Sequence, residues 1–183
     1  LMEQLGFKIS DASTRFQDLS YHINLPTKSI GTFSIFGFGG LSRQNRIALN
    51  DSLNFIQNAS SRSGSLDLSN TGSTGLIHNL NIGNKTSLKT IYSFNGTNYR
   101  EEDNYYNKIN GPLIVTRNNQ FQEANAILSI VATHKINKKN LIKVGFNTNG
   151  RSFFLNQREA VSNILKDKVK EEGDTRLSQY FLQ

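Results

Sequence analysis

Residues 121–136, FQEANAILSIVATHKI, show the pattern that decides the fold class. Apolar and polar side chains alternate along the stretch, which is the period of a β-strand with one apolar and one polar face. The apolar row contains Ala124, Ala126, Leu128, Ile130, Ala132 and Ile136, and the polar row contains Glu123, Asn125, Ser129, Thr133 and Lys135. The stretch therefore predicts a long strand that separates two different environments.

The same alternation recurs along most of the chain. It covers residues 16–25, 32–42, 87–97 and 141–149, and a further strand containing His78 precedes the turn at 81–86. Six strands are therefore predicted in all, with 175–182 as a seventh. Asn occurs 23 times and Gly 14 times in the 183 residues, and both residue types favour turns over helices. The sequence therefore predicts an all-β, antiparallel protein.

Short and long connections alternate between these segments. Residues 25–31, 81–86 and 137–140 are compact polar turns that predict hairpins. Residues 43–69, 98–120 and 150–174 are predicted to be long polar loops, and the apolar spacing within 159–172 predicts a short helix in the last one. His22, His78 and His134 precede the short turns at a constant interval of 56 residues, which indicates a repeated hairpin unit.

This organisation favours an up-and-down transmembrane barrel wall. A tilted strand crosses a bilayer core in about 9–11 residues. Outer-membrane barrels combine such strands with short turns at one end and long loops at the other. Aromatic residues beside the second long connection fit an interfacial girdle, namely Tyr99, Tyr105, Tyr106 and Phe121. The richest apolar stretch, 126–132, is too short for a transmembrane helix.

The basic residues divide by type between the two predicted ends, within a net charge of +7. Lysines mark the short turns at Lys28, Lys85, Lys138 and Lys139. All nine arginines fall in or beside the segments on the long-loop side: Arg15, Arg43, Arg46, Arg62, Arg100, Arg117, Arg151, Arg158 and Arg176. An arginine-rich rim suits the sugar-phosphate surface of a gram-negative outer leaflet, although loops also collect charge for solubility alone.

No motif for catalysis, cofactor binding or nucleic-acid binding is present. The chain has no cysteine, no zinc-type histidine spacing and no Gly-x-Ser-x-Gly elbow, and its basic residues are scattered. The three histidines are better explained as repeated rim residues than as metal ligands. Acidic residues of the long connections could bind a cation or a sugar, or could be solvated charges: Glu101, Glu102, Asp103, Glu171, Glu172 and Asp174. We expect no enzymatic activity.

The strand and turn patterns resemble the barrel region of TonB-dependent outer-membrane receptors. The resemblance rests on residues 7–13, 16–21, 31–42, 74–78 and 85–90. It implies a barrel of about 22 strands filled by a plug domain. It also implies import of a scarce nutrient, such as a siderophore or a glycan, across the cell outer membrane and driven by TonB.

On this interpretation residues 1–183 form a partial outer-membrane β-barrel domain, with no plug domain, TonB box or signal peptide recognisable in them. The expected partners are outer-membrane lipid and lipopolysaccharide, the plug domain, the TonB system and a small-molecule or oligosaccharide ligand. The lumen is expected to be lined by polar residues such as Lys89, Ser93, Asn95, Glu123 and Asn125. A soluble glycan-binding β-sandwich and a TonB-independent porin or enzyme barrel are the alternatives.

Overall fold

The structure is a computed structural model that describes residues 12–50 and 59–183. Residues 7–11 of the stretch that resembles receptor barrels, and residues 51–58 of the first predicted loop, lie outside these described ranges.

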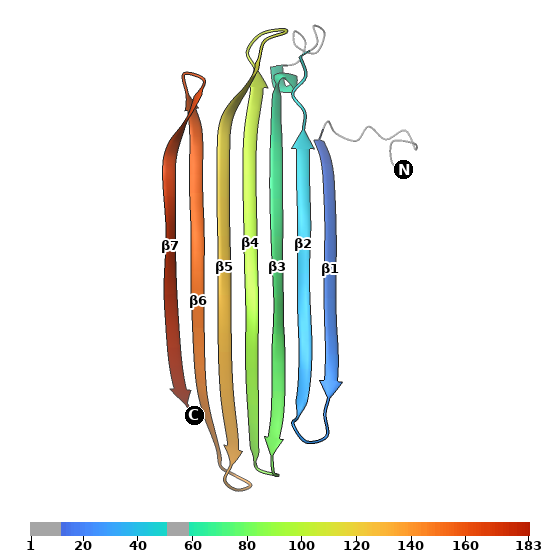
Figure 1. Ribbon diagram of the computed structural model, residues 1–183, viewed down its shortest axis with the longest axis vertical. Coiled ribbons are helices and arrows are strands. Elements are labelled where there is room, and N and C mark those ends of the chain that lie inside the picture. The colour runs from blue at the N-terminus through green and yellow to red at the C-terminus, as the bar shows by residue number, and fades with distance from the viewer. Residues whose placement is uncertain (1–11, 51–58) are drawn as a thin grey trace, which may run out of the picture.

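Seven strands form one antiparallel sheet in which the spatial order follows the chain order (Figure 1). They are β1 (Ala12–Pro26), β2 (Thr32–Arg46), β3 (Ser63–Ile82), β4 (Thr86–Tyr106), β5 (Leu113–Lys135), β6 (Leu141–Val161) and β7 (Ile164–Leu182), with the short 3-10 helix η2 (Ala59–Arg62) before β3. The sheet does not close, and β1 and β7 are its two edges. The all-β, antiparallel, up-and-down prediction is confirmed.

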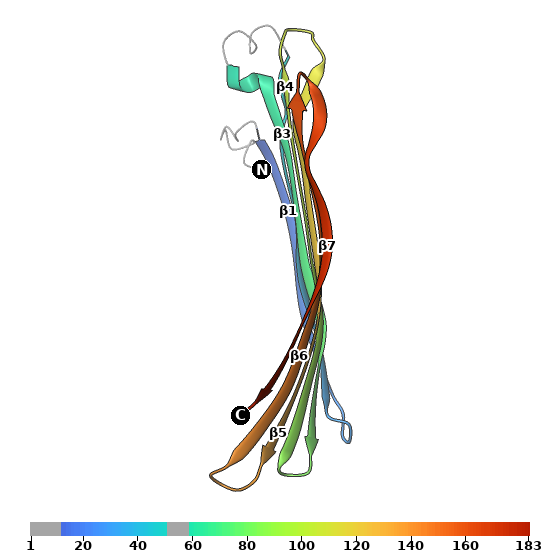
Figure 2. The same cartoon turned by 90° about the vertical axis from the view of Figure 1, so that its left-hand side faces the viewer.

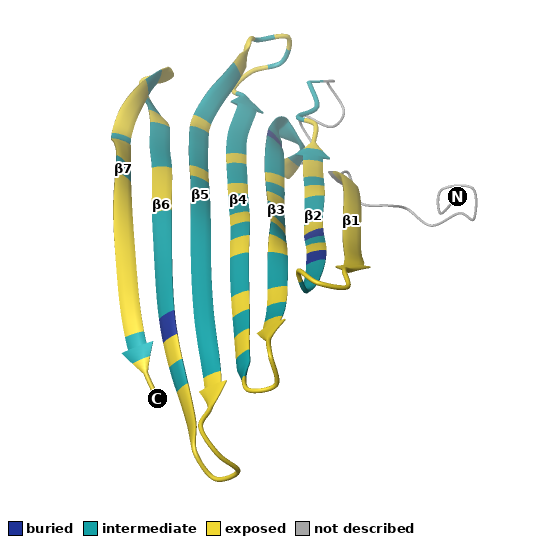
Figure 3. Ribbon diagram, turned by 60° about the horizontal axis from the view of Figure 1, so that its bottom comes forward, coloured by how far each residue is buried: buried dark blue, intermediate teal, exposed yellow. Residues whose placement is uncertain are grey.

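The sheet is a single layer. Figure 2 shows it edge-on as one long twisted ribbon, and Figure 3 shows that most of the strand surface is exposed or half-buried. No large side chain is completely buried among the described residues. The hydrophobic side chains therefore lie on open faces of the sheet, and Leu19, Tyr92 and Phe94 are each at least half exposed.

The three predicted short turns are present, and local hydrogen bonds explain them. The β1–β2 turn is closed by a bond from the Thr27 amide to the Gly31 carbonyl, at 2.9 Å. In the β5–β6 turn the Asn137 side-chain oxygen accepts bonds from the amides of Lys139 and Asn140, both at 2.9 Å. These side-chain bonds replace the backbone partners that the chain loses where it reverses.

The predicted long loops are wrong for two of the three connections. Residues 98–106 and 113–120 extend β4 and β5, so that only residues 107–112 form a loop. Most of 150–174 belongs to β6 and β7. These extensions carry polar side chains on both faces, so they lack the apolar–polar alternation that reveals a strand, and the backbone ladder and cross-strand polar contacts hold them together.

The helix predicted within residues 159–172 is also wrong, because a tight hairpin occupies this position. Ser162 and Asn163 form a two-residue turn with φ of 54° and 64°, and Val161 pairs with Ile164 across it. Two successive positive φ angles are typical of the type I′ turn that joins paired strands. A register shift between Gln157 and Arg158 interrupts the alternation of apolar and polar residues in this segment. The apolar residues of 159–172 therefore fall by chance at a spacing that is typical of a helix.

Candidate functional site

The strand register sorts every side chain onto one of two faces. Residues directly opposite each other in paired strands share a face. One row runs through Ser73, Asn95, Asn125, Arg151 and Thr175, and defines what we call the polar face. The other face carries an apolar band at the end of the sheet that bears the short turns, and we call it the belt face.

The apolar belt crosses all seven strands. It consists of Leu19, Tyr21, Ile23 and Leu25 on β1, Phe33, Ile35 and Leu41 on β2, Leu76, Leu80 and Ile82 on β3, Leu88, Tyr92 and Phe94 on β4, Ala124, Ala126, Leu128, Ile130 and Ala132 on β5, Ile142, Val144 and Phe146 on β6, and Tyr180 and Leu182 on β7. On β5 the belt runs for nine residues, from Ala124 to Ala132. At the level of the β5 belt, the described residues of this face carry no Asp, Glu, Lys or Arg on β1 to β6, whereas β7 carries Asp174 and Arg176 opposite Ser152 and Gly150.

Beyond the belt, the same face becomes polar. From Ala124 toward the N-terminal end of β5, the next residues on the belt face are Gln122, Gln120 and Asn118. Asn118 donates a hydrogen bond to Glu102 of β4 at 3.0 Å. β5 is 23 residues long, more than twice the length of its part of the belt. The strands therefore continue far past the apolar band as an extended wall, and polar side chains predominate there beside single apolar ones such as Leu68 on the belt face and Phe121 on the polar face.

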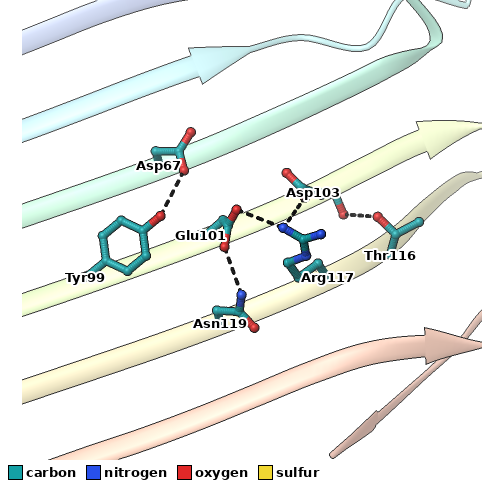
Figure 4. A network of polar contacts seen from close by, with 7 residues as sticks. All are labelled: Asp67, Tyr99, Glu101, Asp103, Thr116, Arg117 and Asn119. Carbon is teal, nitrogen blue, oxygen red and sulfur yellow. Dashed lines mark hydrogen bonds and ion pairs between the residues drawn. The ribbon is translucent and has the colours of Figure 1, made fainter. Parts of the chain in front are cut away.

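A network of polar contacts occupies the polar face of this extended wall (Figure 4). Arg117 of β5 donates to Glu101 of β4 at 3.2 Å and lies 3.5 Å from Asp103. Asn119 donates to the second Glu101 oxygen at 2.8 Å, and Tyr99 donates to Asp67 of β3 at 3.5 Å. The network thus joins three strands through polar contacts.

Burial is the largest influence on the pKa of two groups in this network. Burial raises the pKa of the Asp103 carboxyl group, Arg117 lowers it, and Glu101 and Asp67 add further raising effects. The pKa of Tyr99 is raised by burial and by the charges of Glu101 and Asp67. Arg117 is therefore the cation that allows two carboxylates to stay close together. Sequence reasoning missed this role because cross-strand register, including the shift between Asp103 and Asn104, has no local signal.

The five predicted lumen residues share the polar face. Asn95 lies directly opposite Asn125, and Lys89 and Ser93 follow on the same face of β4. Glu123 accepts hydrogen bonds from Asn125 at 2.8 Å and from Arg151 of β6 at 2.6 Å. The sequence alternation therefore predicted the shared face, while the pairing with Arg151 became visible only in the structure.

The three histidines do not come together. His22 lies on the polar face of β1, opposite Phe36. On the belt face, His78 stacks on Phe33 with ring centroids 4.3 Å apart, and His134 bonds to the Thr86 hydroxyl group at 2.8 Å. Among the described residues, no three histidine or acidic side chains are grouped as a metal site would require.

The acidic runs divide between the two faces rather than forming one cluster. Glu101 and Asp103 lie on the polar face, whereas Glu102 lies on the belt face and pairs with Arg100 at 3.1 Å. On β7, Glu172 lies opposite Phe154 and Glu171 lies opposite Leu155, on opposite faces.

The aromatic girdle predicted beside the second long loop is wrong for two of its members. Tyr99 and Phe121 are register partners within β4 and β5, and they lie on the polar face. Their positions looked terminal in the sequence only because the strands continue through the segment predicted to be a loop.

No protein family, curated protein or solved structure matches the chain in the three comparisons with known proteins. The described part of the chain contains no helix with the length and apolarity needed to cross a membrane.

Proposed function

We propose that residues 1–183 form part of the wall of an outer-membrane β-barrel, in a TonB-dependent receptor that imports a scarce nutrient. The belt face would contact lipid, and the polar face would line the lumen. The strands beyond the belt would stand outside the membrane, where their polar network meets the incoming ligand.

The belt is the observation that carries this proposal. On β5 it runs for nine residues, which matches the roughly 9–11 residues that a tilted strand needs to cross a bilayer core. On β5 it is continuous and its boundary with the polar extension is sharp, because Ala124 is followed by Gln122 and Gln120 on the same face. The belt is lower on β7, where Arg176 and Asp174 lie in the rows of Ala126 and Ala124. Lipid-facing apolar residues that alternate with polar interior residues are the pattern of outer-membrane barrels.

The soluble sandwich explains the belt less well. Sandwich strands are usually about 5–6 residues long and are covered by a second sheet along their whole length. Here the strands after β2 have 19 to 23 residues, and the apolar face ends near their middle. A second sheet packed on the belt would leave the upper half of each strand without a partner.

Open edges support a wall that continues into further strands. The unpaired backbone groups of β1 and β7 cannot remain exposed to lipid, because each unsatisfied group costs several kcal/mol there. Additional strands of the same barrel would pair with both edges. A porin-type barrel without a plug remains the second candidate, since its wall would have the same belt.

Uptake genetics in the native host tests the proposal. Deletion of the gene for the full-length protein should abolish growth on one limiting nutrient, and deletion of tonB should cause the same loss without a further effect in the double mutant. The protein should fractionate with outer membranes. Uptake that persists without TonB would indicate a porin, and a protein recovered without membrane would contradict the barrel.

A further inference from the structure

Two like charges face each other just above the apolar belt. Arg15 of β1 and Arg43 of β2 are register partners on the belt face, and both side chains are exposed. Like charges placed directly opposite each other destabilise a sheet. Neither arginine forms an ion pair with a described residue, and the acidic residues described on these strands and on β3, Asp18 and Asp67, lie on the polar face.

The pair belongs to a basic row at one height of the sheet. The register continues from Arg15 and Arg43 through Leu68, Arg100, Gln120, Asn156 and Lys170. Arg100 pairs with Glu102 at 3.1 Å, and Lys170 lies on the opposite edge strand, so the two adjacent cations of the row without an ion pair to a described residue are Arg15 and Arg43. Arg43 lies two residues beyond Leu41, which is about 7 Å along the strand from the top of the belt. If the belt lies in the hydrocarbon core of a membrane, Arg43 lies at the level of the lipid headgroups.

Hollows on the belt face connect the arginines to apolar surface. One hollow of about 490 Å³ is lined by Arg15, Arg43, Asn70, Leu41 and Gln17, among others. Leu41 and Gln17 also line a second hollow of about 530 Å³, which extends along the belt toward the short turns. Its walls include Leu19, Tyr21, Phe94, Gly39 and Gly72. Because Gly39 and Gly72 have no side chains, they leave space between the larger residues of this hollow, and an extended acyl chain fits in that space.

We propose that this surface binds a phosphorylated glycolipid of the outer leaflet, with a phosphate group between Arg15 and Arg43 and an acyl chain along the lower hollow. Guanidinium groups bind phosphate oxygens in a bidentate geometry, and two of them match a dianionic group. A neutral lipid would leave the repulsion between the arginines uncompensated. The inference rests on the proposed function, because it places the belt face in the membrane.

Native mass spectrometry of the full-length protein in detergent micelles tests this inference. Diphosphorylated lipid A should bind at least about tenfold more tightly than the same glycolipid without phosphate groups. The double variant Arg15→Gln/Arg43→Gln should lose this preference. The double variant Lys89→Gln/Lys143→Gln removes the same charge from the polar face, and it should bind like the wild type.

Other outcomes separate the two proposals. Folding of each variant is checked by its heat-modifiable mobility in gel electrophoresis, and insertion is checked by flotation with lipid vesicles. A protein that inserts but binds both glycolipids equally contradicts the lipid site alone. Displacement of the glycolipid by inorganic phosphate at the same concentration would also contradict it, since the site would then be one for free phosphate. A protein that does not insert contradicts the barrel as well.

Discussion

The hydroxyl group of Tyr21 on β1 forms a hydrogen bond of 2.8 Å with the hydroxyl group of Thr74 on β3, across the full width of β2. The tyrosine ring passes over Gly37, its register partner on β2, and a Cβ atom at Gly37 would lie 2.5 Å from a ring carbon. Aromatic side chains that cover a cross-strand glycine pin the register of a sheet. One side chain thus connects the edge strand to the second strand inward.

Removal of the Tyr21 hydroxyl group should weaken the sheet at this edge. In Tyr21→Phe the Thr74 hydroxyl group loses one of its two bonds and keeps the one that it donates to the Phe36 carbonyl at 3.1 Å, and the free energy of unfolding should fall by about 0.5–1.5 kcal/mol. The measurement is urea unfolding of the full-length protein in detergent micelles. Tyr180→Phe is the matched control, because no hydrogen bond of the Tyr180 hydroxyl group is present among the described residues, and it should leave stability unchanged. An equal loss in both variants would show that the cross-strand bond contributes nothing.

A side chain at Gly37 should be more harmful. Gly37→Ala forces the Tyr21 ring to move, with an expected cost of about 1–3 kcal/mol by overpacking. Gly150→Ala provides the comparison within the same sheet, since a Cβ atom there meets nothing within 4 Å. It should change stability by less than about 0.5 kcal/mol. Thermal unfolding monitored by circular dichroism distinguishes the two, and similar melting temperatures would contradict the role assigned to Gly37.

The β6–β7 hairpin depends on a residue that tolerates positive φ. Asn163 has a φ of 64°, and a β-branched side chain in this conformation costs roughly 1–2 kcal/mol. Asn163→Val should therefore destabilise the hairpin, whereas Asn163→Gly should maintain or increase stability. Limited proteolysis at residues 158–167 reports the local opening. Equal protection of the two variants would be inconsistent with the tight turn.

Two acidic groups of the extended wall should respond to pH in opposite directions. The raised pKa of Asp103 means that its ionised form costs stability above the folded-state pKa, and that this cost disappears as the pH falls toward 3.8. Asp103→Asn should thus be more stable than the wild type at neutral pH, with an advantage that shrinks on acidification. Arg117 would keep Glu101 as its partner.

Glu159 provides the contrasting case. Its pKa is lowered first by the hydrogen bond from Lys168 and then by the charge of Lys168, so its contribution is present above 4.5 and is lost as the pH falls through the folded-state value. Glu159→Gln should lose stability at neutral pH and converge with the wild type in acid. Unfolding curves measured from pH 3 to pH 7 compare both variants, and parallel profiles would contradict the assignment.

Sequence patterning predicted the strands best where one face is apolar. The β5 segment from Ala124 to Ala132 alternates clearly, and the register agrees with the two faces assigned from it. The polar extensions of β4 and β5 gave no such signal, because both of their faces suit water. The turn residues Ser162 and Asn163 were the available signal for a hairpin in place of the predicted helix.

The candidate site was less predictable than the strands. Individual acids such as Glu101 and Asp103 stand out in the sequence, but Arg117 lies on the next strand and reaches them only through the register. The opposed pair of Arg15 and Arg43 likewise depends on which residues face each other across β1 and β2. Such pairs are determined by strand alignment over long sequence separations, which no local pattern specifies.

Site-directed spin labelling tests the central claim, that the belt faces lipid, most directly. Residues 1–183 contain no cysteine, and any cysteine elsewhere in the full-length protein is replaced first. A nitroxide label is then attached at one introduced cysteine in β5 of the membrane-reconstituted protein. The Leu128→Cys label should collide with oxygen and be shielded from a water-soluble nickel chelate, whereas labels at Asn125→Cys and Gln122→Cys should be reached by the chelate. A Leu128→Cys label that is shielded from both reagents would show that protein covers the belt, and would contradict the membrane wall.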